Sequence, residues 1–216
     1  MTTNLYLIRH GEAHSNVEAV IGGMDGDRGL TERGLGQARA LARRLATGEI
    51  AADVLYASTL PRARTTAEHV ATALGLPIRW EEDLHELRPG EADGMRLDEA
   101  RATFEGFSRF LAEPFTPIAP GGESWGTFQA RTSAALERLI TRHQGQTIVA
   151  VAHGGTIEVS FLYLLELGPQ ARKRAAFHVN NTAITHWRHV ETVDGRQEWQ
   201  LVVHNDHRHL IGSSEF

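Results

Sequence analysis

An apolar run near the start of the chain, Leu5 to Ile8, stops abruptly at Arg9-His10-Gly11. Four apolar residues in a row without helical spacing predict a strand buried on both faces, which is typical of a parallel sheet covered by helices. Ligands of open α/β sheets bind at the carboxyl ends of the strands, which is where His10 falls. Taken alone, these residues predict either a binding site or a polar turn that simply ends a strand.

The chain contains a second strand of the same kind. The segment Thr147 to Ala152 is apolar after its first residue and leads directly into His153-Gly154-Gly155. Between these two strands, a short strand over residues 53–57 precedes a helix predicted from Pro61 to Leu74. Arg62 therefore lies near a helix amino terminus, where exposed N–H groups and the helix dipole already favour anions.

The rest of the chain alternates helices with strands. This order predicts an α/β fold, a three-layer sandwich whose mostly parallel central sheet is flanked by helices. We expect a single domain over residues 1–216, with a helical insert at about residues 88–122 near the strand-end site. Further helices are predicted from Thr31 to Leu45, from Met95 to about Leu111, over 123–143 and over 156–165, further strands at 78–80, 183–187 and 199–203, and a loop over 16–28.

Composition excludes several classes of function. The formal net charge of -5, with both signs interspersed, gives no field that would attract nucleic acid or an anionic membrane. The absence of cysteine excludes disulfides, thiolate metal sites and a cysteine nucleophile. No run approaches the roughly 20 apolar residues of a membrane span, so we expect a cytoplasmic protein. His204, His207 and His209 with Asp206 fit no common zinc spacing, so no metal site is expected.

Two histidines at strand ends, arginines at helix starts and an acidic loop over residues 81–91 suit phosphoryl transfer. That reaction needs a nucleophile, cations on the phosphoryl oxygens and an acid for the leaving group. Three blocks, Arg9-His10-Gly11-Glu12, Ser58 to Ala67 and Ala152-His153-Gly154, resemble the signature blocks of the histidine phosphatase superfamily, also called the phosphoglycerate mutase-like family. Their order and spacing run across nearly the whole chain.

The resemblance implies a role for each matched residue. His10 would attack phosphorus and become a phosphohistidine, while Arg9, Arg62 and His153 would hold the phosphoryl oxygens. Unperturbed histidine, with a pKa of about 6.5, is largely neutral near pH 7 and so can act as a nucleophile, whereas arginine stays cationic. Three further positions are expected to bind substrate by the same resemblance: Asn16, Gly154 and Asn181.

The proton donor to the leaving alcohol is assigned to Glu86, which would later activate water. In the family this carboxylate precedes an aromatic-glycine pair and a tryptophan-glutamate-glycine run, but here Pro89 replaces the aromatic residue and Ala92 the tryptophan. This departure implies a pocket with a different lining. Glu82 and Glu91 stay open as alternative proton donors.

The resemblance implies a phosphomonoester hydrolase that needs no cofactor, releases inorganic phosphate from a small phosphorylated metabolite and forms a homodimer. Mutase-type phosphotransfer is the first alternative, although the chain lacks the tyrosine- and proline-rich insert of dedicated mutases. A non-catalytic regulator that binds a phosphorylated ligand is the second. Sugar phosphates, phosphoglycerates, a nucleotide-loop precursor phosphate and broad specificity all stay open as substrates.

Overall fold

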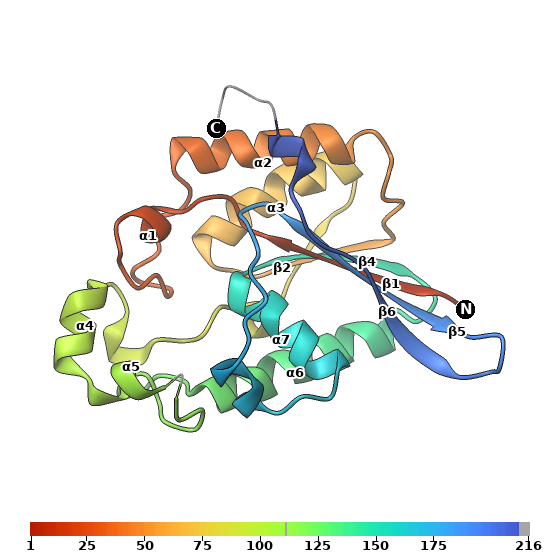
Figure 1. Cartoon of the computed structure of the whole chain (residues 1–216). Helices are drawn as coiled ribbons and strands as arrows, with labels where there is room; N and C mark the ends of the chain where they lie inside the picture. Colours follow the sequence, from red (N-terminus) through yellow and green to blue (C-terminus); the bar gives the residue numbers. More distant parts are fainter. Residues whose placement is uncertain (111, 212–216) are drawn as a thin grey trace.

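The computed structural model describes residues 1–110 and 112–211, and within them a mixed sheet lies between two layers of helices (Figure 1). The strand order is β3-β2-β4-β1-β5-β6, in which β3, β2, β4 and β1 are mutually parallel while β5 runs antiparallel to β1. The strands are β1 (Thr3–Arg9), β2 (Val54–Ala57), β3 (Ile78–Trp80), β4 (Thr147–Ala152), β5 (Ile184–Glu191) and β6 (Gln197–Asp206).

The two central strands are buried on both faces, as their apolar runs predict. Leu5 and Ile148 are fully buried in one apolar cluster, and Ile8 and Val151 are fully buried in a second cluster on the opposite face. Burial of each such side chain stabilises the folded state by roughly 1.5–3 kcal/mol. Burial on both sides is possible because helices cover both faces of the sheet.

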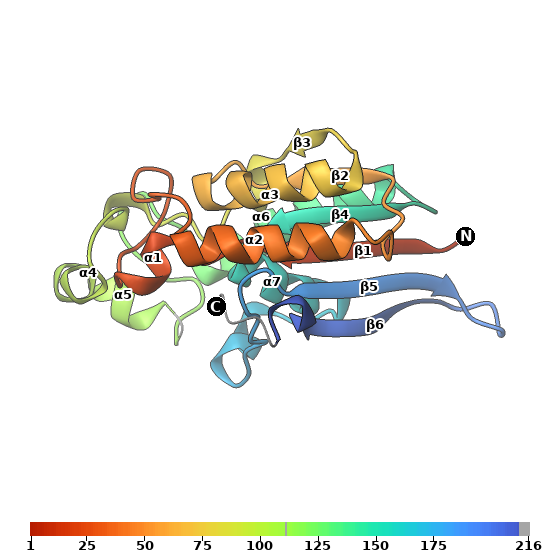
Figure 2. The same ribbon diagram turned by 90° about the horizontal axis from the view of Figure 1, so that it is seen from above.

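The helical layers are α2 (Glu32–Leu45) with α3 (Pro61–Leu74) on one face and α6 (Trp125–Arg142) with α7 (Gly154–Leu164) on the other (Figures 1 and 2). Local signals set their ends. Thr31 caps α2 by accepting a hydrogen bond from the backbone N–H of Gly34, and Gly75 ends α3 in the left-handed conformation. The predicted three-layer α/β sandwich is confirmed.

The insert differs from the single helix predicted from Met95 to about Leu111. It contains two short helices, α4 (Leu97–Thr103) and α5 (Glu105–Arg109), because Phe104 between them is extended, with φ −115° and ψ 114°. The break brings the backbone at Gly106 against the carbonyl of Pro117, a contact that helical periodicity does not encode. Residue 111 lies outside the described residues.

Two other segments depart from expectation. The loop predicted over residues 16–28 overlaps a short helix, α1 (His14–Val17), and the polar tail contributes its first residues to β6. Ring nitrogens of His204 and His209 lie 3.0 and 2.9 Å from the hydroxyls of Thr185 and Thr182. Within the described residues, no three histidine or carboxylate side chains gather as metal ligands, and no helix is long and apolar enough to cross a membrane.

Candidate active site

The sheet topology brings the two strand-end histidines together. His10 follows β1 and His153 follows the adjacent strand β4, and the backbone N–H of His10 donates to the carbonyl of Ala152. Their imidazole ring centroids lie 5.1 Å apart. The turn after β2, on the other side of β4, leads into α3 and delivers Arg62 to the same place. Residues more than 140 positions apart thus form one cluster at the carboxyl edge of the sheet.

The hydrogen bonds of His10 select one tautomer. Nδ1 lies 2.6 Å from the carbonyl oxygen of Gly11, which can only accept, so Nδ1 carries the proton. Nε2 accepts from Nε–H of Arg62 at 3.1 Å and is therefore the unprotonated nitrogen, the one that carries the lone pair. Burial, followed by the positive charges of Arg62 and Arg9, holds the pKa of His10 well below 6.5. A neutral imidazole with Nε2 facing the cations is a competent nucleophile.

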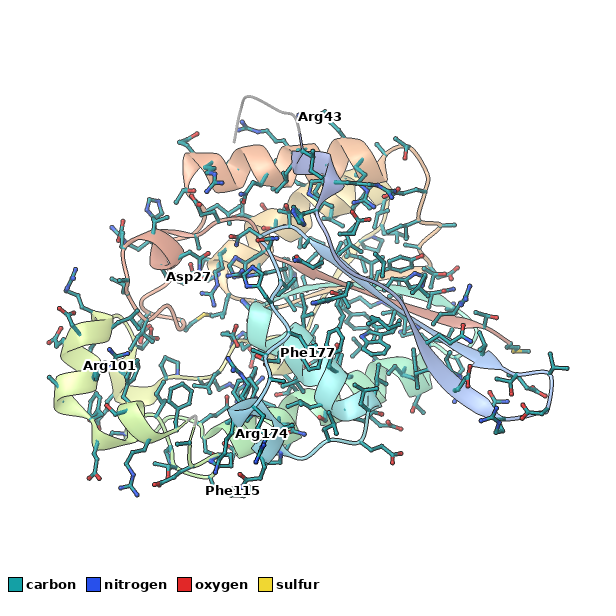
Figure 3. The ribbon with its side chains drawn as sticks, viewed as in Figure 1. Asp27, Arg43, Arg101, Phe115, Arg174 and Phe177 are labelled. Atoms are coloured by element: carbon teal, nitrogen blue, oxygen red, sulfur yellow. The ribbon has the colours of Figure 1, made fainter. Side chains whose placement is uncertain are left out.

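Arg62 is held by a carboxylate that the sequence did not single out. Its backbone N–H and its Nη1 both donate to Oδ2 of Asp27, at 3.2 and 2.9 Å. Nη1 also donates to the carbonyl of Gly22, and the Asp27 side chain is fully buried. Figure 3 labels Asp27 in the loop that follows α1. Because a guanidinium is planar, these contacts fix the direction in which Arg62 presents its Nε–H to His10.

Two polar groups in the cluster have unused hydrogen-bonding capacity. Among the described residues, none pairs with Nε of Arg9 or with Nδ1 of His153, although both atoms are buried. Nη1 of Arg9 donates to the carbonyl of Val179, and Nε2 of His153 lies 2.7 Å from the hydroxyl of Ser58. Burial is the main cause that lowers the pKa of both side chains. Leaving such groups unpaired costs about 1–3 kcal/mol each, and phosphoryl oxygens would satisfy them.

The Glu86 carboxylate lies at the amino terminus of α7, beside Gly155, which is two residues beyond His153. Its Oε2 accepts from the backbone N–H of Gly155 at 2.9 Å, and its Oε1 accepts from its neighbour Leu87 at 3.1 Å. Arg131 donates to the backbone carbonyls of residues 83, 85 and 86 and so holds this loop in place. Glu86 is half-buried whereas Glu82 and Glu91 are exposed, which favours Glu86 among the three carboxylates.

The other expected substrate-binding residues lie around the rim. Asn181 donates through Nδ2 to the carbonyl of His10 at 3.0 Å, and the same Nδ2 lies 3.4 Å from Oδ1 of Asn16. Gly154 opens α7, and a methyl group added there would lie 3.6 Å from Nε of Arg9. The structure thus brings together all eight predicted positions, and their roles remain predictions.

A cavity of about 370 Å³ adjoins Glu86 and Gly155. Its walls come mainly from apolar residues of the insert and of the segments beside it: Ile21, Leu87, Phe107, Phe110, Ile118 and Trp125. Arg172 also lines it, with Nε 3.0 Å from Oε1 of Glu158. A second cavity of about 300 Å³ also reaches Glu86 and is lined by more polar residues, among them Asp25, Arg88 and Asp93.

Comparison with known proteins agrees with this geometry. A family model described as the histidine phosphatase superfamily (branch 1) matches residues 5–207. The chain belongs to the histidine phosphatase superfamily. Within this superfamily it is 34% identical over 181 residues to phosphoserine phosphatase 1 of Hydrogenobacter thermophilus, covering 83% of each chain. It is also 31% identical over 176 residues to the 2,3-bisphosphoglycerate-dependent phosphoglycerate mutase of Brucella anthropi, covering 79% of this chain and 85% of the mutase.

Solved structures give the same result. The phosphoserine phosphatase of Entamoeba histolytica, crystallised in complex with 3-phosphoglyceric acid, superposes with a TM-score of 0.79 and 30% identity, covering 97% of this chain and all of that one. The histidine phosphatase fold and the three sequence blocks of this chain therefore agree. The relatives include both phosphatases and mutases.

Sequence reasoning missed three residues of this candidate site. Asp27 lies in the expected loop, Gly155 follows the third block, and Ser58 begins the second block without an assigned role. Their partners lie 35, 69 and 95 positions away along the chain. The one available signal was the position of Ser58 at the start of the second block and of Gly155 directly after the third.

Proposed function

We propose that this chain is a metal-independent phosphomonoesterase that hydrolyses a small phosphorylated metabolite through a phosphohistidine on His10. The observation that carries the proposal is the orientation of His10: its protonated Nδ1 is held by the carbonyl of Gly11, and its unprotonated Nε2 faces the guanidinium of Arg62. A phosphoryl group bound by that guanidinium lies next to the nitrogen that attacks it. We place the reaction in the cytoplasm.

In the first step, Nε2 of His10 attacks phosphorus and the bond from phosphorus to the ester oxygen breaks. Glu86 gives its proton to the departing oxygen, so a neutral alcohol leaves. Arg9, Arg62 and His153 stabilise the charge on the phosphoryl oxygens. Removing one such donor from an active site typically raises the activation free energy by about 3–4 kcal/mol. Binding of a phosphate dianion raises the pKa of His153 and so favours its protonated, donating form.

In the second step, water attacks the phosphohistidine and Glu86 accepts its proton. The bond from phosphorus to Nε2 breaks, inorganic phosphate leaves and His10 returns to its neutral tautomer. Side chains supply every cation that these two reaction steps require, so activity is expected to persist when a chelator is added.

Hydrolysis is favoured over mutase chemistry by the charge beside Glu86. A mutase must hold a second phosphate or a carboxylate of its substrate, which needs further unpaired cations. Among the described residues that line the 370 Å³ cavity, the one cation is Arg172, and it is paired with Glu158. Phosphotransfer remains the second candidate because the Brucella anthropi mutase is nearly as similar as the Hydrogenobacter thermophilus phosphatase. A purely binding regulator is disfavoured because all the reacting groups are present.

The test is to trap the phosphoenzyme. Wild type mixed with a phosphomonoester in chelator and quenched rapidly under alkaline denaturing conditions should carry one acid-labile phosphate on the peptide that contains His10. The His10→Ala variant should carry none and lose turnover. His189→Ala is the matched control, because His189 pairs with Thr3 at the opposite end of β1. Full turnover in His10→Ala would refute the proposal.

A second measurement separates the two candidate reactions. If the chain is a hydrolase, incubation with 3-phosphoglycerate and 2,3-bisphosphoglycerate should not isomerise the monophosphate. Rapid isomerisation without net phosphate release would instead establish the mutase.

A further inference from the structure

The 370 Å³ cavity beside Glu86 carries information about the alcohol that leaves. Two aromatic residues of the insert, Phe107 and Phe110, line it together with Ile118 and Trp125. Glu86 and Gly155 form part of the same lining. The cavity therefore begins at the carboxylate that is proposed to protonate the leaving oxygen and continues between apolar walls.

Apart from Glu86, the charged residues that line this cavity are one acid and one base, Glu158 and Arg172. Glu158 lies in contact range of Arg172, with their Oε1 and Nε atoms 3.0 Å apart, and the Arg172 guanidinium carbon lies 5.4 Å from the centroid of the Trp125 ring. Glu158 is only 6% exposed, and burial raises its pKa. An anionic group entering the cavity would meet a guanidinium whose charge Glu158 already balances, although these two groups are not aligned for a hydrogen bond, and a carboxylate that repels it. The cavity therefore disfavours carboxylates and second phosphates.

We infer that this cavity holds the alcohol part of the substrate and that this alcohol is apolar and uncharged, a ring or a chain of several carbons. The inference rests on the proposed function, because it takes Glu86 as the proton donor. The donor must lie within hydrogen-bond reach of the leaving oxygen, so the carbon attached to that oxygen starts at Glu86. From there the alcohol lies against apolar walls. An alcohol with a large apolar surface gains more free energy by burial against these walls than a polar alcohol does.

The second cavity is the competing place for the alcohol. It holds Arg88, but also the carboxylates of Asp25 and Asp93. Asp93 is engaged with backbone N–H groups of residues 23, 25 and 26, and Arg88 lies 3.6 Å from a carboxylate oxygen of Asp83. A polar, cationic or hydroxyl-rich alcohol would fit there better than in the apolar cavity. Substrate preference therefore distinguishes the two cavities.

The experiment compares ethyl, butyl and hexyl phosphate, whose alcohols have nearly equal acidity and differ only in apolar length. A buried methylene is worth about 0.8 kcal/mol, or roughly fourfold in kcat/KM, so hexyl phosphate should exceed ethyl phosphate by on the order of 10²-fold. Phosphoserine and glycerol phosphate should be poorer than butyl phosphate. Binding of the matching alkylphosphonates to wild type, measured by calorimetry, should tighten in the same order.

Variants locate the effect. Phe110→Ser should reduce the ratio of hexyl to ethyl phosphate turnover at least tenfold. Phe115→Ser should keep the wild-type ratio, because Phe115 is 70% exposed and does not line the cavity (Figure 3). If Phe110→Ser fails to fold, the wild-type phosphonate series still decides.

Each outcome separates the two proposals. A flat response to chain length, or a preference for phosphoserine, with phosphohistidine still formed, would overturn the apolar leaving group and leave the phosphatase intact. Hydrolysis of no phosphomonoester and no phosphohistidine would overturn both.

Discussion

The contact between Gly155 and Glu86 makes a sharp prediction about proton donation. A Cβ added at Gly155 would overlap Oε1 of Glu86, and it would also meet the ring of Phe128. The Glu86 carboxylate must then move by about 1 Å, and a misplacement of that size in an active site typically costs about 10²-fold in rate. We therefore expect Gly155→Ala to lower kcat about 10²-fold, or about 2.7 kcal/mol, on alkyl phosphates.

The dependence on the leaving group identifies the cause. Nitrophenolate leaves without a proton, so Gly155→Ala should reduce turnover of nitrophenyl phosphate much less than that of butyl phosphate. Glu86→Gln should show the same pattern. In the double variant, Gly155→Ala should add little to the loss from Glu86→Gln, because both changes remove one function.

Gly168→Ala is the matched control. Gly168 lies just before Pro169, has an ordinary negative φ, and has no atom within contact of a Cβ placed on it. It should leave both rates unchanged. Melting temperatures of all variants check that folding is not the cause. Equal losses on butyl and nitrophenyl phosphate, or additive losses in the double variant, would refute the assignment of Glu86 as the proton donor.

Three further predictions concern ionisable side chains that are buried or partly buried. Asp27→Asn leaves the Arg62 guanidinium buried without its counter-charge, which should lower the free energy of unfolding by about 3–5 kcal/mol in urea titration, and inorganic phosphate should raise the melting temperature more in the variant than in wild type. An unchanged free energy would contradict this. Glu158→Gln frees Arg172 to bind an anion, so kcat/KM for 3-phosphoglycerate relative to hexyl phosphate should rise about tenfold, whereas the exposed Glu166→Gln should have no effect. Burial lowers the pKa of His85, His186 and His209 to about 4. Since unfolded histidines titrate near 6.5, the unfolded chain takes up protons first, so stability should be complete above pH 6.5 and fall toward pH 4, with His209→Gln showing a shallower fall in urea titrations. Equal unfolding free energies at pH 7.5 and 5 would contradict the last of these.

Local sequence carried most of the fold. The apolar runs at Leu5 and Ile148 predict buried strands because their apolar residues are consecutive and not spaced as in a helix. Thr31 marks a helix start through a capping hydrogen bond, and Gly75 marks a helix end through its left-handed backbone conformation. The interruption of the insert at Phe104 was missed, because apolar residues continue at helical spacing across it, and the break places Gly106 against Pro117, eleven residues away. The spacing of apolar residues indicates which face of a helix is buried. It does not indicate which distant segment of the chain packs against that face.

The sequence by itself identified the candidate reacting groups, because two parallel strands of one sheet that each lead into a histidine end at the same edge. Only the tertiary structure decided the orientation, protonation and position of those groups. Asp27 aims Arg62, Gly11 and Arg62 select the tautomer of His10, and Gly155 seats Glu86 beside an apolar cavity. The physical reason is that hydrogen bonds and cavities depend on distances between atoms that the chain brings together only when it folds.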